Sequence, residues 1–472
     1  MSMARRTMRV GICGAGPAGL TLAAILSREA DKGAFEVKVF ERGEADRDQG
    51  SGWDMSKAAL EALSRAGVEP RTVQREGSDT MRFYRTGASR PDVCLRLPSY
   101  LKRWGMKKED VGLDQMNLET ERNLIIDGLM GELGGEVAVE HGANVRAARR
   151  KGEGVELLGP NQQPLGDFDL VVDASGVHSH ARGARFTEAA DAFYTGVCLL
   201  QGVLRSPEES LAPEIVSKLG EGSFGIFGPT VNGEGVLELF VQRYGAAHDN
   251  KVANVNISVP FEDPKAFAAL VGLSGVHGIT SKPEHINAVK RYYKESLAHE
   301  DWPQCYRELF DDIEAVRLLP VHMHPMSEVA LGELGVVEGS DSLCLVGVGD
   351  ALHALPPWSG TSGNFAMQDS ADLATALLDL QKREEGWSSE SLALVARECE
   401  RKFLERADEP RQRCIDAGKS AKDKLTTPVK DYDFVLSHIT GQKSMFASVE
   451  TFFIVSFLKT LTWMNWFENY GL

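Results

Sequence analysis

A glycine-rich turn near the N-terminus carries the clearest chemistry in the sequence. Residues 14–19 read Gly-Ala-Gly-Pro-Ala-Gly, after a strand-like run at 10–13 and before a helical pattern at 20–30. In that context Gly14 permits a tight turn, Gly16 lets a pyrophosphate approach the backbone, and Gly19 allows close helix packing. Free N–H groups and the helix dipole would then hold the anion.

A carboxylate stands where this fingerprint requires one. Residues 35–40 predict a second strand, which ends at Glu41 and Arg42 some twenty residues after the turn. There the Glu41 carboxylate can accept hydrogen bonds from both hydroxyls of an adenosine ribose. Turn and carboxylate together predict a Rossmann-type unit, but they do not separate NAD from FAD.

A second signature makes that separation. Residues 347–364 read GVGDALHALPPWSGTSGN, which resembles the second motif of the flavoprotein aromatic hydroxylases, the single-component FAD monooxygenases. The resemblance implies that Asp350 binds the ribityl chain of FAD and that the backbone from Gly360 to Asn364 meets the isoalloxazine at a helix N-terminus. N–H groups there can stabilise negative charge on the reduced flavin. Asp369 matches the Asp that trails this motif.

Two further segments resemble the same family. Arg122, in the sequence Glu-Arg-Asn-Leu, matches an arginine that approaches the flavin. Residues 169–182 read DLVVDASGVHSHAR and resemble the segment D-L-V-V-G-A-D-G-x-x-S-x-V-R. The chain departs from this segment at Asp173, which replaces a glycine, and at Ser175, which replaces an aspartate tied in the family to flavin and NAD(P)H handling.

Within the family the sequence is most similar to the tetracycline-inactivating FAD monooxygenases, loosely from the first strand to about residue 380. Residues 47–55, RDQGSGWDM, resemble a loop in which the Arg contacts NADPH and the Asp contacts FAD; the matching residues are Arg47 and Asp54. Gln201, Glu238 and Phe240 match positions that face substrate.

Alternation supports the substrate assignment independently. In the run 236–242, Leu237, Leu239 and Val241 face one way, and Glu238 and Phe240 face the other. The aliphatic side suits a domain core, and the mixed side suits a pocket with a few placed polar groups.

Two sets of site residues follow from these patterns. The predicted cofactor-binding residues are Gly14, Ala15, Gly16, Gly19, Glu41, Arg42, Arg47, Asp54, Arg122, Gly349, Asp350, Gly360, Gly363 and Asn364. The predicted substrate-binding residues are Gln201, Glu238, Phe240, Pro357 and Trp358.

Neither a catalytic side chain nor a metal site is predicted. A flavin supplies the hard chemistry, so no nucleophile with a base is needed. The pairs His178 with His180 and His322 with His324 have no third ligand in sequence, and metal binding is therefore not expected.

The expected activity follows from the resemblance. NAD(P)H would reduce FAD transiently and leave, O2 would give a C4a-hydroperoxyflavin, and one oxygen atom would hydroxylate or epoxidise an aromatic or polycyclic small molecule. The alternatives are an FAD-dependent oxidoreductase without oxygen insertion, a flavin-binding protein without turnover, and a flavin-dependent halogenase, although the W-x-W-x-I-P motif of halogenases is absent.

Composition limits the partners. The 472 residues carry a formal net charge of −16, which disfavours binding to a nucleic acid backbone. Seven scattered cysteines suit a reducing compartment, and no export signal is recognised, so we expect a cytoplasmic protein.

The predicted fold is α/β, with a Rossmann-type FAD-binding domain, an inserted β-rich substrate domain and C-terminal helices. The predicted bounds are 1–85, 110–190 and 315–385 for the FAD-binding domain, 86–109 and 191–314 for the substrate domain, and 386–472 for the C-terminal helical region. The segment 390–424 predicts a charged surface helix. The apolar tail 446–467 is interrupted by Glu450 and Lys459, so it predicts burial against the body or a partner, or peripheral membrane contact, rather than a transmembrane segment.

Overall fold

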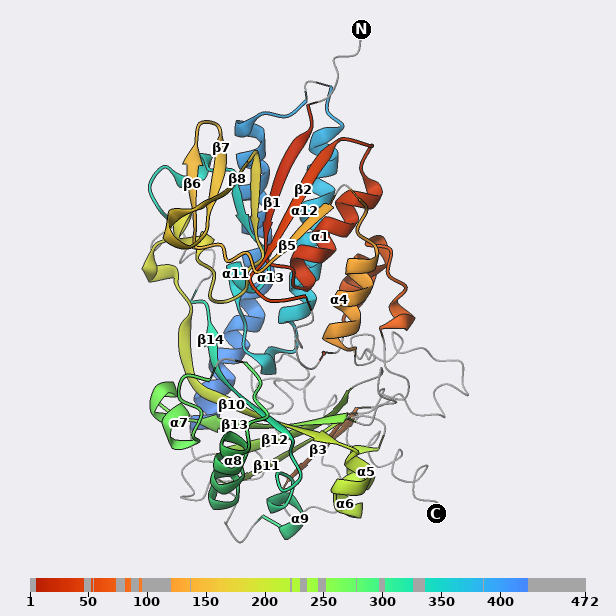
Figure 1. Cartoon of the computed structure of the whole chain (residues 1–472), viewed down its shortest axis with the longest axis vertical. Helices are drawn as coiled ribbons and strands as arrows, with labels where there is room; N and C mark the ends of the chain where they lie inside the picture. Colours follow the sequence, from red (N-terminus) through yellow and green to blue (C-terminus); the bar gives the residue numbers. More distant parts are fainter. Residues whose placement is uncertain are drawn as a thin grey trace, which may run out of the picture. The chain divides into compact units, whose positions relative to one another are not determined.

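The computed structural model forms two compact units (Figure 1). One comprises residues 1–74, 122–193 and 322–412, and the other comprises 75–121, 194–321 and 413–472. The structure describes residues 6–45, 52–53, 55–73, 81–85, 93–95, 120–135, 137–220, 223–229, 236–244, 252–276, 278–296, 302–325, 336–384 and 386–422.

The first unit is built on a parallel five-stranded sheet with the order β15-β9-β1-β2-β5. Its strands are β1 (Met8–Cys13), β2 (Phe35–Glu41), β5 (Val137–His141), β9 (Leu170–Asp173) and β15 (Leu345–Gly347). Short apolar runs buried on both faces are what such a sheet requires, and this confirms the strands predicted at 10–13 and 35–40.

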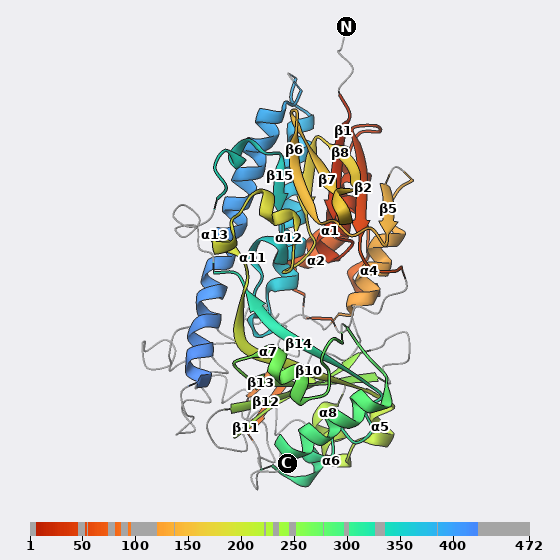
Figure 2. The ribbon, with the colours of Figure 1, turned by 60° about the vertical axis from the view of Figure 1, so that its left-hand side comes forward.

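Helices pack together on one face of this sheet and a small antiparallel sheet covers the other (Figure 2). The helices are α1 (Pro17–Glu29), α2 (Lys57–Arg65), α4 (Arg122–Gly131) and α12 (Ser362–Gln381). The small sheet has strands β6 (Ala147–Lys151), β7 (Gly154–Leu158) and β8 (Pro164–Phe168). Alternation along β1 sends Ile12 toward Gly19 of α1, whereas a Cβ added to Gly11 would meet the Phe168 ring of β8 at 2.7 Å.

The first unit also contains α11 (Asp350–His353) and, as far as residue 412, α13 (Ser389–Lys422). The predicted helix over 390–424 is therefore present, but it is not only a surface helix. Leu392, Phe403 and Leu404 join the hydrophobic core, and Glu400 is buried as well. The many charged residues of this segment led to the prediction of a surface helix, although its apolar residues pack into the core.

The second unit is built on a seven-stranded sheet with the order β14-β10-β13-β12-β11-β3-β4. Its strands are β3 (Met81–Arg85), β4 (Val93–Leu95), β10 (Phe193–Arg205), β11 (Ser223–Pro229), β12 (Val236–Tyr244), β13 (Val252–Pro260) and β14 (Ala315–Met323). Its helices are α5 (Pro207–Ser210), α6 (Pro213–Leu219), α7 (Pro264–Leu270), α8 (Pro283–Ser296) and α9 (Gln304–Arg307).

One face of this sheet is the core of the second unit. Leu239 and Val241 of β12 are fully buried in an aliphatic and aromatic cluster, together with Phe224 and Ile226 of β11 and Val255 of β13. Alternation then places Glu238 and Phe240 on the opposite face, as the sequence pattern predicted.

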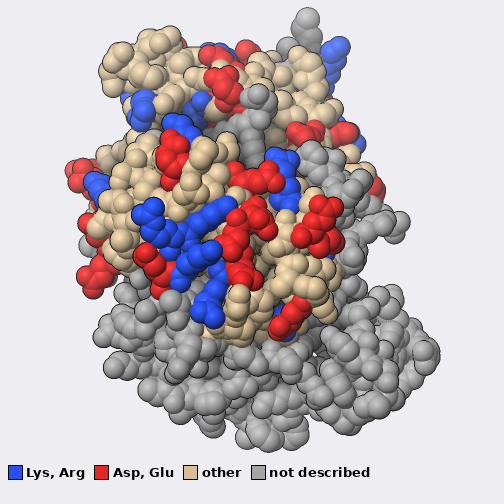
Figure 3. All heavy atoms as spheres, turned by 60° about the horizontal axis from the view of Figure 1, so that its bottom comes forward, with Lys and Arg blue, Asp and Glu red and all other residues tan. Residues whose placement is uncertain are grey.

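Two structural features concern the expected partners, namely the charge of the surface and the length of the helices. Side chains of both charge signs lie side by side on the described part of the face in Figure 3. Within the described ranges, no helix has the length and apolar content needed to cross a bilayer. The predicted tail at 446–467 lies outside the described residues.

Candidate functional site

The carboxyl ends of three adjacent strands meet at one edge of the parallel sheet. Cys13 of β1 pairs with Asp173 of β9, and Asp173 pairs in turn with Gly347 of β15. The turns that follow these strands are in contact, because a Cβ on Gly14 would lie 2.5 Å from the carbonyl oxygen of Ala174. Ligands of open α/β sheets bind outside the carboxyl ends of the strands, so this edge is the candidate site.

The three glycines of the first turn have different surroundings. Gly14 has a φ of +106°, which disfavours any residue with a Cβ. A Cβ on Gly19 would lie 2.1 Å from the carbonyl oxygen of Gly14, so close packing of α1 requires glycine there. A Cβ on Gly16 would meet nothing within 4 Å, so space for a ligand lies beside this residue.

Glu41 ends β2 next to this turn. Its Oε2 accepts a hydrogen bond from the N–H of Ala15 at 2.9 Å, and its Oε1 accepts one from the N–H of Gly43 at 2.7 Å. The carboxylate is partly exposed, and the next residue, Arg42, is exposed. Glu41 is thus held against the glycine-rich turn with lone pairs left for a further donor.

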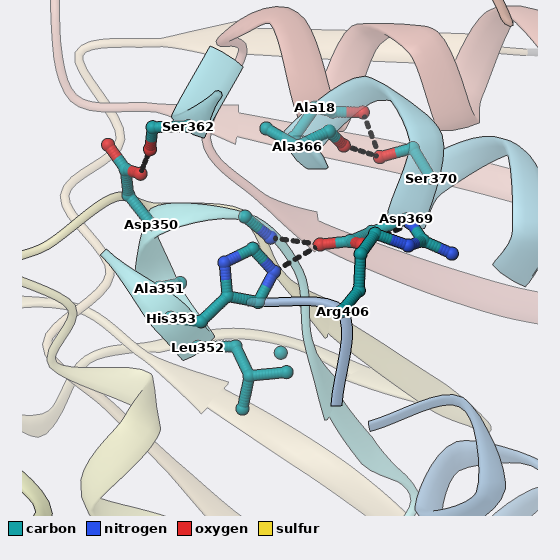
Figure 4. Close-up of polar contacts among 12 residues, drawn as sticks. Ala18, Asp350, Ala351, Leu352, His353, Ser362, Ala366, Asp369, Ser370 and Arg406 are labelled. Carbon is teal, nitrogen blue, oxygen red and sulfur yellow. Dashed lines mark hydrogen bonds and ion pairs between the residues drawn. The ribbon is translucent and has the colours of Figure 1, made fainter. Parts of the chain in front are cut away.

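Asp350 is the first residue of α11 and lies between two glycine-containing turns. Its Oδ1 accepts a hydrogen bond from the Ser362 hydroxyl at the start of α12 (Figure 4). The preceding residue, Gly349, has a φ of +56°, and a Cβ there would lie 3.8 Å from the Cβ of Ala18. The carboxylate of Asp350 is therefore fixed close to the first turn of α1.

A cluster of buried charged side chains holds the loop that carries Asp350. Asp369 of α12 is fully buried and accepts hydrogen bonds from the N–H of Gly349 at 3.0 Å, from His353 Nε2 at 2.6 Å and from Arg406 of α13 at 2.9 Å (Figure 4). Burial lowers the pKa of His353, but the charge and the hydrogen bond of Asp369 outweigh it, so that the pKa is raised.

The N-terminus of α12 presents unused donors. No side chain caps α12 at Thr361, and the Thr361 hydroxyl is itself buried without a hydrogen-bond partner. Gly360 takes the left-handed conformation with a φ of +64°. Asn364 closes the turn, because it accepts a hydrogen bond from the N–H of Ser56 at 2.7 Å and donates one to Gly360 at 3.2 Å. A buried donor without a partner is costly, so these groups indicate a ligand with acceptor oxygens.

An aromatic ring joins α4 to the same helix end. The Trp53 ring lies against Gly363, where an added Cβ would approach it to 2.6 Å. The guanidinium of Arg122, the first residue of α4, lies 5.6 Å from the centroid of that ring. Arg122 therefore reaches the N-terminal end of α12 through Trp53.

The two residues that depart from the family segment contact each other. The buried Asp173 accepts hydrogen bonds from Ser175 Oγ at 2.6 Å and from Ser179 Oγ at 2.5 Å. Burial raises the pKa of Asp173, and these hydrogen bonds offset part of that effect. Nearby, the Arg182 guanidinium binds carbonyl oxygens of Ala351 and Leu352, and burial lowers its pKa to about 10.

Most of the predicted cofactor residues meet at this edge, namely Gly14, Ala15, Gly16, Gly19, Glu41, Arg122, Gly349, Asp350, Gly360, Gly363 and Asn364. Arg47, Asp54 and the side chain of Trp358 lie outside the described residues. Pro357 opens a short 3-10 turn before α12. Sequence reasoning assigned no role to the side chains of Trp53, Thr361 and Arg406, although Trp53 lies in the loop 47–55 and Thr361 in the second signature.

Of the predicted substrate residues, Gln201, Glu238 and Phe240 belong to the second unit, whereas Pro357 and Trp358 belong to the first. Gln201 of β10 donates a hydrogen bond to Asn256 of β13 at 2.8 Å, and both side chains are buried. Glu238 accepts a hydrogen bond from Ser258 at 3.2 Å. Burial raises the pKa of Glu238, and the Ser258 hydrogen bond offsets part of the rise.

The residues at the sheet edge fit FAD. A pyrophosphate fits the open space at Gly16 and the uncapped N-terminus of α1. Glu41 offers acceptors for a ribose, and Asp350 offers one for a polyol chain. The unused hydroxyl of Thr361 and the uncapped α12 suit the polar edge of an isoalloxazine.

Comparisons with known proteins agree with this fit. Residues 274–406 match the FAD binding domain family model. Monooxygenase asqM of Emericella nidulans is 27% identical over 403 residues, covering 78% of this chain and 83% of that protein. The 3-amino-4-hydroxybenzoate 2-monooxygenase PtnB3 of Streptomyces platensis is 26% identical over 435 residues, covering 88% of this chain and 93% of that protein.

Solved structures share the fold. CtdE in complex with FAD and a substrate superposes with a TM-score of 0.65 at 16% identity, covering 96% of this chain and all of that one. Tetracycline destructase Tet(51) superposes with a TM-score of 0.56 at 12% identity, covering 97% of this chain and 98% of that one. At such identities the likeness extends to the fold alone, and the closer likeness to tetracycline-inactivating enzymes stays a prediction.

Three findings point to the same kind of enzyme. Two curated relatives are monooxygenases by name, residues 274–406 match an FAD binding domain, and the donors at the sheet edge fit FAD. The chain is therefore an FAD-dependent monooxygenase, and it resembles the aromatic hydroxylases.

Proposed function

We propose that the chain uses NAD(P)H and O2 to insert one oxygen atom into an aromatic or polycyclic small molecule, by hydroxylation or epoxidation. The second oxygen atom leaves as water, with a hydride from NAD(P)H and a proton from solvent. The observation that carries the proposal is the pair of uncapped helix N-termini, of α1 and α12, at the edge where Glu41 and Asp350 also lie. Bound FAD supplies the electron transfer and the activation of O2.

The residues of the chain bind the cofactor and orient it. Gly16 and the N-terminus of α1 take the pyrophosphate, Glu41 takes the adenosine ribose, and Asp350 takes the ribityl chain. The N–H groups that begin α12 face negative charge on the flavin ring. Asp369 is a positioning residue, because it holds Gly349 and His353 in the loop that carries Asp350.

The substrate is assigned to the second unit. Phe240 offers an apolar surface to an aromatic ring, and Glu238 and Gln201 supply polar groups that set its orientation. Within the described residues only one dinucleotide-binding unit is evident, so NAD(P)H is expected to react transiently and leave.

The experiment is a screen of aromatic and polycyclic compounds for faster NAD(P)H oxidation, with products identified by mass under isotopically labelled O2. Incorporation of one labelled oxygen atom per turnover supports the proposal. NAD(P)H oxidation without label in any product would favour the alternative, an oxidoreductase that inserts no oxygen.

The cofactor roles have a separate test. Asp350→Ala should lose FAD during purification and become paler than the yellow wild type, because the ribityl contact is gone. Asp379→Ala, on an exposed position of α12, is the matched control and should stay yellow. A wild type that remains colourless with added FAD would overturn the assignment.

A further inference from the structure

The non-core face of the seven-stranded sheet carries polar side chains in register. Ser223, Gln242 and Asn254 are direct neighbours across β11, β12 and β13, and we call these three the amide row. All three alternate with core residues such as Phe224, Val241 and Val255, so they lie on the face opposite the core.

The amide row continues into the predicted substrate residues. Phe240 and Asn256 are paired two residues further along β12 and β13, and Gln201 is the partner of Asn256 on β10. Glu238 and Ser258 form the next pair. From the amide row to the Glu238–Ser258 pair, these side chains extend about 14 Å along the strands.

The amide row is polar, buried and unsatisfied. Ser223 and Asn254 are 0% and 1% exposed, and neither Ser223 Oγ nor Asn254 Nδ2 has a hydrogen-bond partner. No hydrogen bond is described for the Gln242 side chain between them. The Gln201 amide on the same face donates to Asn256 and is satisfied.

The missing partner must accept hydrogen bonds. Asn254 Nδ2 can only donate, and the Ser223 hydroxyl can turn to donate as well. Ser223 and Asn254 flank Gln242 and are two strand spacings, about 10 Å, apart, so each donor needs its own acceptor, such as a carbonyl oxygen. A donor-only group, such as an ammonium, would leave Asn254 Nδ2 unsatisfied.

Charge distinguishes a carbonyl from a carboxylate. The amide row contains no cation, and among the described side chains of β10, β11, β12 and β13 the only cation on this face is Arg205, at the end of β10. Arg205 is 62% exposed and already ion-paired with Glu314 at 3.0 Å. A carboxylate at the row would be desolvated without a countercharge, and Glu238 lies on the same face, which makes an uncharged group the better fit.

We propose that Ser223, Gln242 and Asn254 recognise uncharged acceptor groups of the substrate, carbonyl oxygens of the amide, lactam or ketone type, with Asn254 Nδ2 as the principal donor. This proposal rests on the proposed function, because it names the substrate class of the same enzyme. It makes the three residues specificity-determining residues that the sequence motifs do not reveal.

Two probes with the same ring test the charge preference. Naphthalene-2-carboxamide and naphthalene-2-carboxylate are titrated calorimetrically into the FAD-loaded full chain. The carboxamide should bind at least tenfold more tightly, because a carboxylate would be buried unpaired. Equal or tighter binding of the carboxylate, or no binding of the carboxamide at its solubility limit, overturns the proposal.

Isosteric variants test the residues. Asn254→Leu removes the unpartnered donor without exposing another group, so folding should be retained. Carboxamide affinity should fall about tenfold in Asn254→Leu and less in Ser223→Ala. Thr21→Val is the matched control, because Thr21 Oγ1 is also buried without a partner but belongs to α1 of the other unit; its affinity should not change.

The outcomes separate the two proposals. Unchanged carboxamide affinity in Asn254→Leu means that the row binds only water, and this overturns the inference. Binding in the expected order without oxygen transfer to any compound refutes the proposed function and leaves the recognition row standing.

Discussion

Nε2 of His353 lies 2.6 Å from Oδ2 of Asp369, and the same carboxylate accepts a hydrogen bond from the N–H of Gly349. Through these two contacts, one buried side chain on α12 fixes the turn and the short helix that present Asp350. The carboxylate is neutralised from the other side by Arg406 of α13.

Asp369→Asn should therefore destabilise the protein and loosen the flavin. Breaking a buried pair leaves an uncompensated charge, and the expected loss is about 3–5 kcal/mol in the free energy of unfolding. Asp372→Asn is the matched control, because Asp372 also contacts Arg406 but is exposed, and it should cost at most about 1 kcal/mol. Urea denaturation measures the free energy of unfolding of both variants. Equal decreases in the two variants would contradict the role of Asp369 in holding the Asp350 loop.

Glu41→Ala should weaken FAD binding at least tenfold. Charge-assisted hydrogen bonds from ribose hydroxyls are each worth about 1.5–3 kcal/mol when buried. The variant also loses the hydrogen bonds that the N–H groups of Ala15 and Gly43 donate to Glu41. Glu36→Ala, at an exposed position of the same strand, is the control. Titration of apoprotein with FAD measures both affinities, and an unchanged value for Glu41→Ala would place the adenosine elsewhere.

Two glycine substitutions should separate folding from binding. Gly19→Ala meets the Gly14 carbonyl and should lower the free energy of unfolding by about 1–3 kcal/mol. Gly16→Ala meets no protein atom within 4 Å, so stability of the apoprotein should change by less than about 1 kcal/mol. Its methyl group would occupy the pyrophosphate space, so FAD affinity should fall at least tenfold. If Gly16→Ala binds FAD normally, the pyrophosphate lies away from this turn.

His324 should make the protein sensitive to acid. Burial holds the pKa of its imidazole well below the usual value, and the charge of Arg182 adds to this. The unfolded chain then binds more protons than the folded one, so stability rises with pH up to about 6.5 and is lost as pH falls below that value.

The acid sensitivity is tested by Tm as a function of pH. In the folded protein His324 Nδ1 accepts a hydrogen bond from the N–H of Ala354 at 2.9 Å, and Asn can offer an acceptor there without titrating. His324→Asn should therefore flatten the decline of Tm between pH of about 6.5 and 5. His180→Asn, at an exposed ring, should leave the slope unchanged. A wild-type slope in His324→Asn would assign the proton uptake to other groups, such as the neighbouring His178, whose pKa burial also lowers.

Substitutions on the mixed face of β12 should affect turnover and spare the cofactor. Phe240→Ala and Glu238→Gln should raise KM for the substrate or uncouple NAD(P)H oxidation from product formation, because both residues lie on the non-core face. FAD content should remain near that of the wild type. Variants that unfold or lose FAD would place this face in a structural core, and wild-type kinetics would place it in solvent.

The sequence by itself determined the parallel sheet and its nucleotide turn. The pattern of glycines at 14, 16 and 19 and the carboxylate at 41 is local, and Gly14 and Gly19 each answer a steric demand. Alternation along 236–242 likewise separated the core face from the mixed face, because side chains of a strand point to opposite sides. These features depend on neighbours within a few residues.

Only the tertiary structure decided which distant side chains meet. Asp369 finds Arg406 on another helix, and Ser223 and Asn254 come from strands on either side of a third. Asp173 and Ser175 replace a glycine and an aspartate of the family segment. Only the structure shows that their two side chains form a hydrogen bond with each other. The reason is physical: burial, unsatisfied donors and pKa shifts depend on the packing around a group, and the order of residues in the chain does not specify that packing locally.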